Sequence, residues 1–405
     1  MLNVGGDYSR VPTHPHPLPQ GAGTATPLRN EALARAAYIH VPFCFHHCGY
    51  CNFTVIAGRN DLVGDYLRAV EMEMASLPAM QQVDTLYFGG GTPTQLSPAA
   101  LRELFTIVRR RINPAPNAEI TIEANPADMD TEKATLLAEL GVTRVSLGAQ
   151  SFHDDKLKRL QRDHMADDSR RAIERLRCAG IASLSLDLIF AAPGETLDGW
   201  HDDLTQAISL LPEHISTYGL TFEKGTTFYG RLDRGELTQC DEESERAMYL
   251  AAIERLTAAG YEHYEVSNFA QPGRRSRHNQ TYWTGEPYLA FGPGAARFIG
   301  GTREMNHRSV TTYLHRVLAG ESPVADRETL SPTESARERL VFGLRRLAGV
   351  NVDDFARYTG FTVNELAGPS IDKFIALGLL ECGDGRLRLT REGLLVSDSL
   401  WPELL

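Results

Sequence analysis

Between residues 37 and 260, short apolar runs alternate with longer segments in which apolar residues recur at helical spacing. The short runs predict β-strands at residues 38–41, 85–88, 119–123, 144–147, 183–190 and 214–222. The longer segments predict helices at residues 97–111, 131–140, 167–179, 199–210 and 242–259. Such alternation is typical of parallel βα units. Six units predict an α/β protein with a partial (β/α)6 barrel, in which functional groups gather at the carboxyl ends of the strands.

The pattern changes on both sides of this alternation. Residues 1–30 are rich in Pro, Gly and Thr and predict a disordered segment, so the barrel is expected within residues 31–270. Residues 271–310 look like connecting loops with one short strand. Residues 311–405 predict several short helices, a strand at 386–389 and a final helix, which is the outline of a small winged-helix domain.

A winged helix raises the hypothesis of DNA binding, and the charge argues against it. Residues 311–405 contain 11 Lys and Arg against 14 Asp and Glu, and the whole chain has a net charge of −11. Phosphate contacts supply most nucleic-acid affinity, so we expect no nucleic-acid partner and a packing or protein-interaction role instead. No apolar run approaches the ~20 residues that cross a bilayer. We therefore expect no transmembrane segment, and any association with a membrane protein would be a transient contact. With no secretion signal and no disulfide pattern, the sequence predicts a cytoplasmic protein.

Three of the six cysteines, Cys44, Cys48 and Cys51, lie within eight residues and have the spacing C-x3-C-x2-C. A [4Fe–4S] cluster normally takes four cysteine ligands. Three ligands would leave one iron open, where S-adenosylmethionine (SAM) could bind through its amino and carboxylate groups. The alternatives are cysteines that merely pack, or a zinc site. A nearby histidine would complete that zinc site: His40, His46 or His47.

Other candidate residues stand at the ends of the predicted strands. Glycines at 89–91 let the backbone approach a ligand closely, although an ordinary tight turn would also explain them. Glu123 ends the next strand and could accept hydrogen bonds from ribose hydroxyls or an ammonium group, and Gln150 ends the strand after that. Asp187 lies inside an apolar strand, where a carboxylate needs a partner; a structural ion pair is the alternative.

Two further residues have both a functional and an ordinary interpretation. Arg162 could clamp a carboxylate, or it could be a solvated helix charge. His278 stands beside Tyr282 and Trp283 and could ligate a haem iron while the aromatic rings cover the macrocycle. A hydrogen-bonded histidine is the alternative.

Together these motifs resemble the radical SAM superfamily, its coproporphyrinogen III oxidase-like branch and, within that branch, the HemW haem chaperone family. The resemblance extends from residue 37 to the C-terminus. It rests on these segments: 38–44, 89–91, 123–126, 147–151, 186–189, 265–270 and 278–283.

The resemblance implies roles for particular residues. Cys44, Cys48 and Cys51 would ligate the cluster. The positions that match contacts to the cluster-bound SAM are Tyr38, Gly90 and Glu123. Those that match contacts to a second SAM in the related oxidase are Tyr50, Gly91, Thr92, Gln150, Arg162 and Asp187. His278 would be the haem ligand within the segment H-N-x-x-Y-W.

Two positions bear on the function. The oxidases extend the motif to C-x3-C-x2-C-x-C, whereas this chain has Phe53 at the last position, preceded by Asn52, as in the chaperone-like group. Arg297 stands where the family more often has a histidine. The resemblance therefore implies a haem chaperone that passes haem to acceptor proteins, expected among respiratory proteins, and that receives electrons from a donor. The alternative is an oxygen-independent coproporphyrinogen III oxidase, a radical SAM oxidoreductase.

Overall fold

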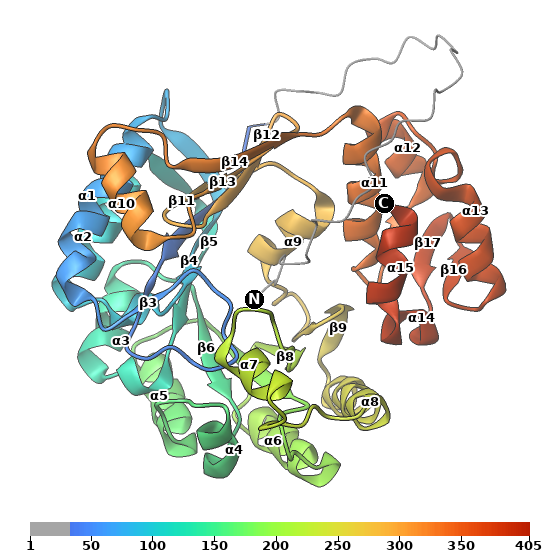
Figure 1. Cartoon of the computed structure of the whole chain (residues 1–405), viewed down its shortest axis with the longest axis horizontal. Coiled ribbons are helices and arrows are strands. Elements are labelled where there is room, and N and C mark those ends of the chain that lie inside the picture. The colour runs from blue at the N-terminus through green and yellow to red at the C-terminus, as the bar shows by residue number, and fades with distance from the viewer. Residues whose placement is uncertain (1–32) are drawn as a thin grey trace.

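Seven parallel strands form the centre of a 12-stranded sheet in the computed structural model, which describes residues 33–405 (Figure 1). In spatial order they are β11 (Tyr288–Phe291), β1 (Ala36–Val41), β4 (Gln81–Gly90), β5 (Ile112–Ala124), β6 (Arg144–Gln150), β7 (Ser183–Phe190) and β8 (His214–Gly219). All six predicted strands are present, and the α/β fold class is confirmed. The last predicted strand ends at Gly219 rather than at residue 222. The predicted disordered segment, residues 1–30, lies outside the described residues.

Helices cover one face of this sheet. The predicted helices are found as α2 (Pro98–Arg109), α3 (Thr131–Glu139), α5 (Ala166–Cys178), α6 (Leu197–Ser209) and α8 (Glu242–Ala258). The helix between the first two strands, α1 (Val63–Ala75), was not predicted. Two short helices, α4 (Asp154–Arg159) and α7 (Thr227–Asp233), follow β6 and β8. Each parallel connection therefore returns over the apolar face of the sheet.

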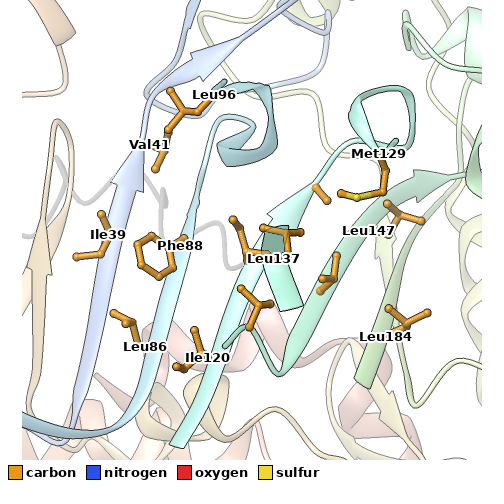
Figure 2. Close-up of a cluster of buried hydrophobic side chains, with 14 of the residues drawn as sticks. Ile39, Val41, Leu86, Phe88, Leu96, Ile120, Met129, Leu137, Leu147 and Leu184 are labelled. Carbon is orange, nitrogen blue, oxygen red and sulfur yellow. The ribbon is translucent and has the colours of Figure 1, made fainter. Parts of the chain in front are cut away.

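Strand residues alternate between this apolar face and a polar one, as the pleat requires. Figure 2 shows the apolar face, where Ile39, Leu86, Phe88, Ile120, Leu147 and Leu184 from five strands pack with Leu137 of α3. Phe88 stacks on Phe105 of α2 at 4.3 Å between ring centroids. Burial of each such side chain contributes ~1.5–3 kcal/mol. The intervening residues form the opposite face, which is unusually polar: Tyr38, Tyr87, Glu123, Ser146 and Asp187.

The region 271–310 is more regular than the predicted loops with one short strand, and that prediction was wrong. It contains α9 (Arg277–Thr284), β11, β12 (Ala296–Ile299) and β13 (Thr302–Asn306). The antiparallel strands β12, β13 and β14 (Val324–Thr329) continue the sheet beyond β11, while β10 (Asn268–Ala270) and β9 (Glu262–Glu265) end it beyond β8. The strands here have only four or five residues and are separated by glycines, so they show little of the alternation that identifies a strand.

A second, smaller core lies at the C-terminal end. It is built from α11 (Pro332–Leu344), β15 (Val350–Asn351), α12 (Val352–Thr359), α13 (Val363–Ala376), β16 (Leu380–Gly383), β17 (Arg386–Leu389), α14 (Arg391–Leu395) and α15 (Ser397–Leu404). The strand predicted at 386–389 is β17, and the small helical domain with a three-stranded wing is confirmed. Within residues 33–405, no helix has the length and apolar character needed to span a bilayer. The predicted domain boundaries stay predictions.

Glu73 of α1 connects the segment 292–313, which includes β12 and β13, to the first helix of the barrel. Its buried carboxylate accepts hydrogen bonds from the Gly292 backbone nitrogen (2.9 Å), Asn306 Nδ2 (2.7 Å) and the Tyr313 hydroxyl (2.6 Å). Tyr313 belongs to α10 (Val310–Leu318), which packs on α1. Burial raises the pKa of Glu73, and the three donors offset the cost of burying this group.

We expect Glu73→Ala to lower the free energy of unfolding by about 3 kcal/mol, because it leaves three buried donors without an acceptor. Urea unfolding measures the change. The control is Glu71→Ala on the same helix, whose exposed carboxylate pairs with Arg110 and should cost only about 0.5 kcal/mol. Equal effects of the two variants would contradict this role of Glu73.

Candidate functional site

The cysteine loop begins where β1 ends and is held against the glycine loop that follows β4. Gly91 donates its backbone N–H to the Val41 carbonyl at 2.8 Å, and Thr92 donates to the Phe43 carbonyl at 2.7 Å. Cys44 ends the short strand β2 (Phe43–Cys44), which pairs with β3 (Ile56–Ala57). The parallel register of β1 and β4 thus places the two loops side by side.

Each of the three consecutive glycines is required by a close neighbour. A Cβ on Gly89 would lie 2.6 Å from Glu123 Oε1, and one on Gly91 would lie 2.6 Å from the Phe43 carbonyl oxygen and 3.0 Å from Cys44 Sγ. Gly90 has φ +113°, and its Cβ would meet the His40 ring at 2.5 Å. An ordinary tight turn needs no such contacts. The glycines therefore let backbone reach the cysteines and Glu123 together.

Polar side chains surround the cysteine sulfurs. Thr92 Oγ1 lies 3.6 Å from Cys44 Sγ. Arg162 donates from Nη1 to Cys48 Sγ (3.4 Å) and from Nη2 to the Gly148 carbonyl (3.1 Å), so it is not a solvated helix charge. Burial raises the pKa of Cys44 to about 12 and that of Cys51 to about 11. Metal binding at these thiols would therefore release protons.

The zinc alternative has little support from the neighbouring histidines. Both ring nitrogens of His40 are used: Nδ1 hydrogen-bonds the Tyr38 hydroxyl (3.1 Å) and Nε2 the Thr54 carbonyl (2.7 Å). His47 Nε2 lies 3.1 Å from the Cys51 carbonyl, and His46 is exposed. Among residues 33–405, no three His, Cys, Asp or Glu side chains converge on a point that could hold one metal ion. Three free cysteines on one loop suit three separate corners of a cubane cluster better.

Glu123 is a buried carboxylate with two donors. Its Oε1 accepts from the Tyr87 hydroxyl at 2.8 Å and its Oε2 from the Gly90 backbone nitrogen at 3.0 Å. Burial raises the pKa of Glu123 to about 7, although the Tyr87 hydrogen bond works in the opposite direction. A carboxylate of this kind can exchange its proton near neutral pH and favours a cationic ligand beside it.

The remaining predicted residues lie around the same edge of the sheet. Gln150 ends β6 in the left-handed region, with φ +63°. Asp187 accepts from Ser146 Oγ at 3.0 and 3.2 Å; in the described part of the chain no cationic side chain forms an ion pair with it. Tyr50 packs on Phe228 of α7, with ring centroids 6.1 Å apart. The structure therefore brings the predicted cluster and nucleotide residues to one face.

His278 lies deeper, on the polar face of the sheet rather than at this edge. Its Nδ1 hydrogen-bonds Thr85 Oγ1 at 2.8 Å and its Nε2 the Tyr282 hydroxyl at 2.9 Å. Burial lowers the pKa of His278 to about 3. Because both ring nitrogens already have partners, iron ligation would have to replace one of these bonds. The predicted role as haem ligand stays a prediction.

Sequence reasoning missed Tyr87 and a basic cleft. Tyr87 could have been found from the alternation of polar residues in β4, which places it on the same face as Glu123. The cleft has a volume of about 370 Å³ and lies between α4 and α7. Its lining includes Lys158, Arg159 and Arg231 beside the apolar Leu237. Arg231 and Leu237 are distant in sequence from Lys158 and Arg159, so only the fold reveals that the four residues gather.

Comparison with known proteins gives a consistent result. Residues 38–207 match the radical SAM superfamily, and residues 330–396 match the HemN C-terminal domain. Heme chaperone HemW of Bacillus subtilis is 38% identical over 376 residues, covering 92% of this chain and 99% of that protein. Heme chaperone HemW of Lactococcus lactis is 34% identical, covering 91% and 97%. The chain belongs to the HemW family of the radical SAM superfamily.

The fold is also found in the coproporphyrinogen III oxidase HemN of Escherichia coli, a radical SAM enzyme. The TM-score is 0.81 at 21% identity, covering 93% of this chain and 91% of HemN. Arg297, where the resemblance led us to expect a histidine, has a partner within the sheet. Its Nε donates to Glu304 Oε2 at 2.6 Å across β12 and β13, so it takes part in a local ion pair.

The raised pKa of Glu123 makes folding stability depend on pH. The folded pKa is about 7 and the ordinary value is 4.5. Because the folded-state pKa is raised, the contribution of protonated Glu123 to the free energy of unfolding is fully present below pH 4.5 and is lost as the pH rises through 7. We expect the unfolding free energy of Glu123→Gln, minus that of the wild type, to increase by about 3 kcal/mol between these limits. Urea unfolding across this range measures it, and a constant difference would contradict the assignment.

Proposed function

We propose that this protein is a haem chaperone, which binds haem, a [4Fe–4S] cluster and SAM and transfers haem to acceptor proteins. The observation that carries the proposal is the near full-length similarity to HemW of Bacillus subtilis, named a heme chaperone. The cysteine loop supports it, because Phe53 stands where the porphyrin-forming oxidases are expected to have a fourth cysteine.

In this proposal Cys44, Cys48 and Cys51 hold the cluster, and Arg162 donates to the Cys48 sulfur. N–H donors to cluster sulfurs are one of the means by which a protein adjusts the cluster's potential. When bound, the cluster and SAM supply one-electron reductive chemistry. The chain's own residues orient the nucleotide and exclude water.

The nucleotide subsite is proposed next to the glycine loop. Tyr38, the Gly90 backbone and Glu123 would contact the SAM that is bound to the cluster. An ionised Glu123 would attract the cationic ligand. A second nucleotide position is proposed from the resemblance, formed by Tyr50, Gly91, Thr92, Gln150, Arg162 and Asp187.

Haem is the proposed cargo, and its binding groups remain to be tested. His278 is the proposed ligand by resemblance, at the expense of its bond to Thr85 or to Tyr282. The cleft formed by Lys158, Arg159 and Arg231 has the charge to hold the haem propionates. We also propose respiratory acceptor proteins, a separate electron donor and a location in the cytoplasm, where thiols stay reduced.

The cluster assignment predicts a cysteine-specific loss of iron. After anaerobic reconstitution, Cys44→Ser should bind less iron and sulfide per chain and show weaker absorbance near 400 nm than the wild type, because the loop loses one of three thiolates. Cys178→Ser is the matched control, since Cys178 is an exposed free cysteine on α5. Equal losses in the two variants would place the cluster elsewhere.

The chaperone assignment predicts transfer without porphyrin chemistry. The reconstituted protein should bind haem in a spectroscopic titration and pass it to an apo-haem protein. Under anaerobic reducing conditions with SAM it should not convert coproporphyrinogen III. Efficient formation of protoporphyrinogen IX, with the E. coli HemN enzyme as positive control, would favour the oxidase alternative instead.

A further inference from the structure

A buried carboxylate of the sheet binds the backbone at the start of the helix that carries His278. Glu119 of β5 accepts from the backbone nitrogens of His278 (3.0 Å) and Arg277 (3.2 Å) at the start of α9. A carboxylate is favoured at a helix N-terminus. Arg144 lies 3.3 Å from the same carboxylate, so the pair is fixed in position. This arrangement places the His278 ring at one position on the polar face of the sheet.

The ring of His278 belongs to an aromatic cluster. Tyr87 lies against it with ring centroids 4.9 Å apart and an interplanar angle of 29°. Tyr38 lies 5.9 Å from Tyr87 and 6.5 Å from His278. Tyr38 and Tyr87 are partners in the register of β1 and β4. The His278 ring is therefore stacked on Tyr87 and lies beside Tyr38 in a cluster of three rings.

This aromatic cluster contacts the carboxylate of the proposed nucleotide subsite. Tyr87 donates its hydroxyl to Glu123 Oε1 at 2.8 Å. A change of the Tyr87 χ1 angle would carry the hydroxyl away from Glu123, and the His278 ring is stacked against the Tyr87 ring. His278 is itself held at both nitrogens by Thr85 and Tyr282. These contacts link His278 to Glu123 through Tyr87.

We propose that His278 is a positioning residue of the nucleotide subsite: it holds Tyr87 against Glu123 and so couples the segment 278–283 to SAM binding. This inference rests on the proposed SAM subsite. It differs from a role as haem ligand alone, because it predicts an effect of His278 in the absence of haem.

A second histidine provides a matched control. His214 of β8 is buried and has the same kinds of partner, with Ser185 Oγ on Nδ1 and the Tyr264 hydroxyl on Nε2, both at 2.8 Å. Its ring packs on Tyr264. Neither Tyr87 nor Glu123 is among its hydrogen-bond partners in the described part of the chain. His214→Gln should therefore reproduce the loss of stability without the loss of SAM affinity.

The experiment is calorimetric titration of SAM into the anaerobically reconstituted, haem-free protein. His278→Gln should weaken SAM binding roughly tenfold, and Tyr87→Phe by a similar factor, since each disturbs one hydrogen bond to a charged group. The double variant should also lose only about tenfold, because the two residues act through the same contact. His214→Gln should bind SAM as the wild type does, at a comparably reduced melting temperature.

Three results would overturn the inference: unchanged SAM affinity in His278→Gln, multiplied losses in the double variant, or equal losses in His214→Gln. If His278→Gln does not fold, Tyr282→Phe replaces it in the test. This variant removes only the hydroxyl that hydrogen-bonds His278 Nε2, and it should weaken SAM binding by a smaller factor. Failure of the proposed function is recognised separately, because the wild type itself would then bind no SAM.

Discussion

The structure depends on the parallel register of β1, β4 and β5. This register brings three carboxyl ends to one edge of the sheet, which carry the cysteine loop, the glycine loop and Glu123. Backbone hydrogen bonds from Gly91 and Thr92 then join the glycine loop to the cysteine loop. Because a slip by one residue would turn every side chain to the opposite face, the same register that buries Phe88 also places Tyr87 beside Glu123.

The polar face of the sheet is the second consequence of this register. In the proposed function this face holds a charged nucleotide, which requires polar side chains, and each of them needs a partner when it is buried. The chain meets this requirement with linked groups: Thr85, His278, Tyr282, Tyr87 and Glu123. In the proposed function, the segment associated with haem and the carboxylate associated with SAM are thus parts of one network. α9 lies between the sheet and the C-terminal domain and is in contact with both, through β4 and α11 (Figure 1).

The sequence predicted the six central strands and five of the covering helices, because each has a clear period of two or 3.6 residues. It also indicated which residues gather at the carboxyl edge, since parallel strands present their ends together. It did not predict α1, and it expected only one short strand where β11, β12 and β13 lie, because these strands have four or five residues and are separated by glycines. The network around His278 was also missed. Thr85 and His278 are 193 positions apart, and only the folded chain shows that both nitrogens of that ring have partners.

The most direct test of this account is electron paramagnetic resonance of the reconstituted, reduced protein with and without SAM. In the proposed function the reduced protein gives the signal of a [4Fe–4S] cluster, and this signal changes on addition of SAM, because SAM would occupy the iron that three cysteines leave open. Cys44→Ser should weaken this signal. A wild-type protein that gives no cluster signal, or one whose cluster signal SAM leaves unchanged, would contradict the central claim.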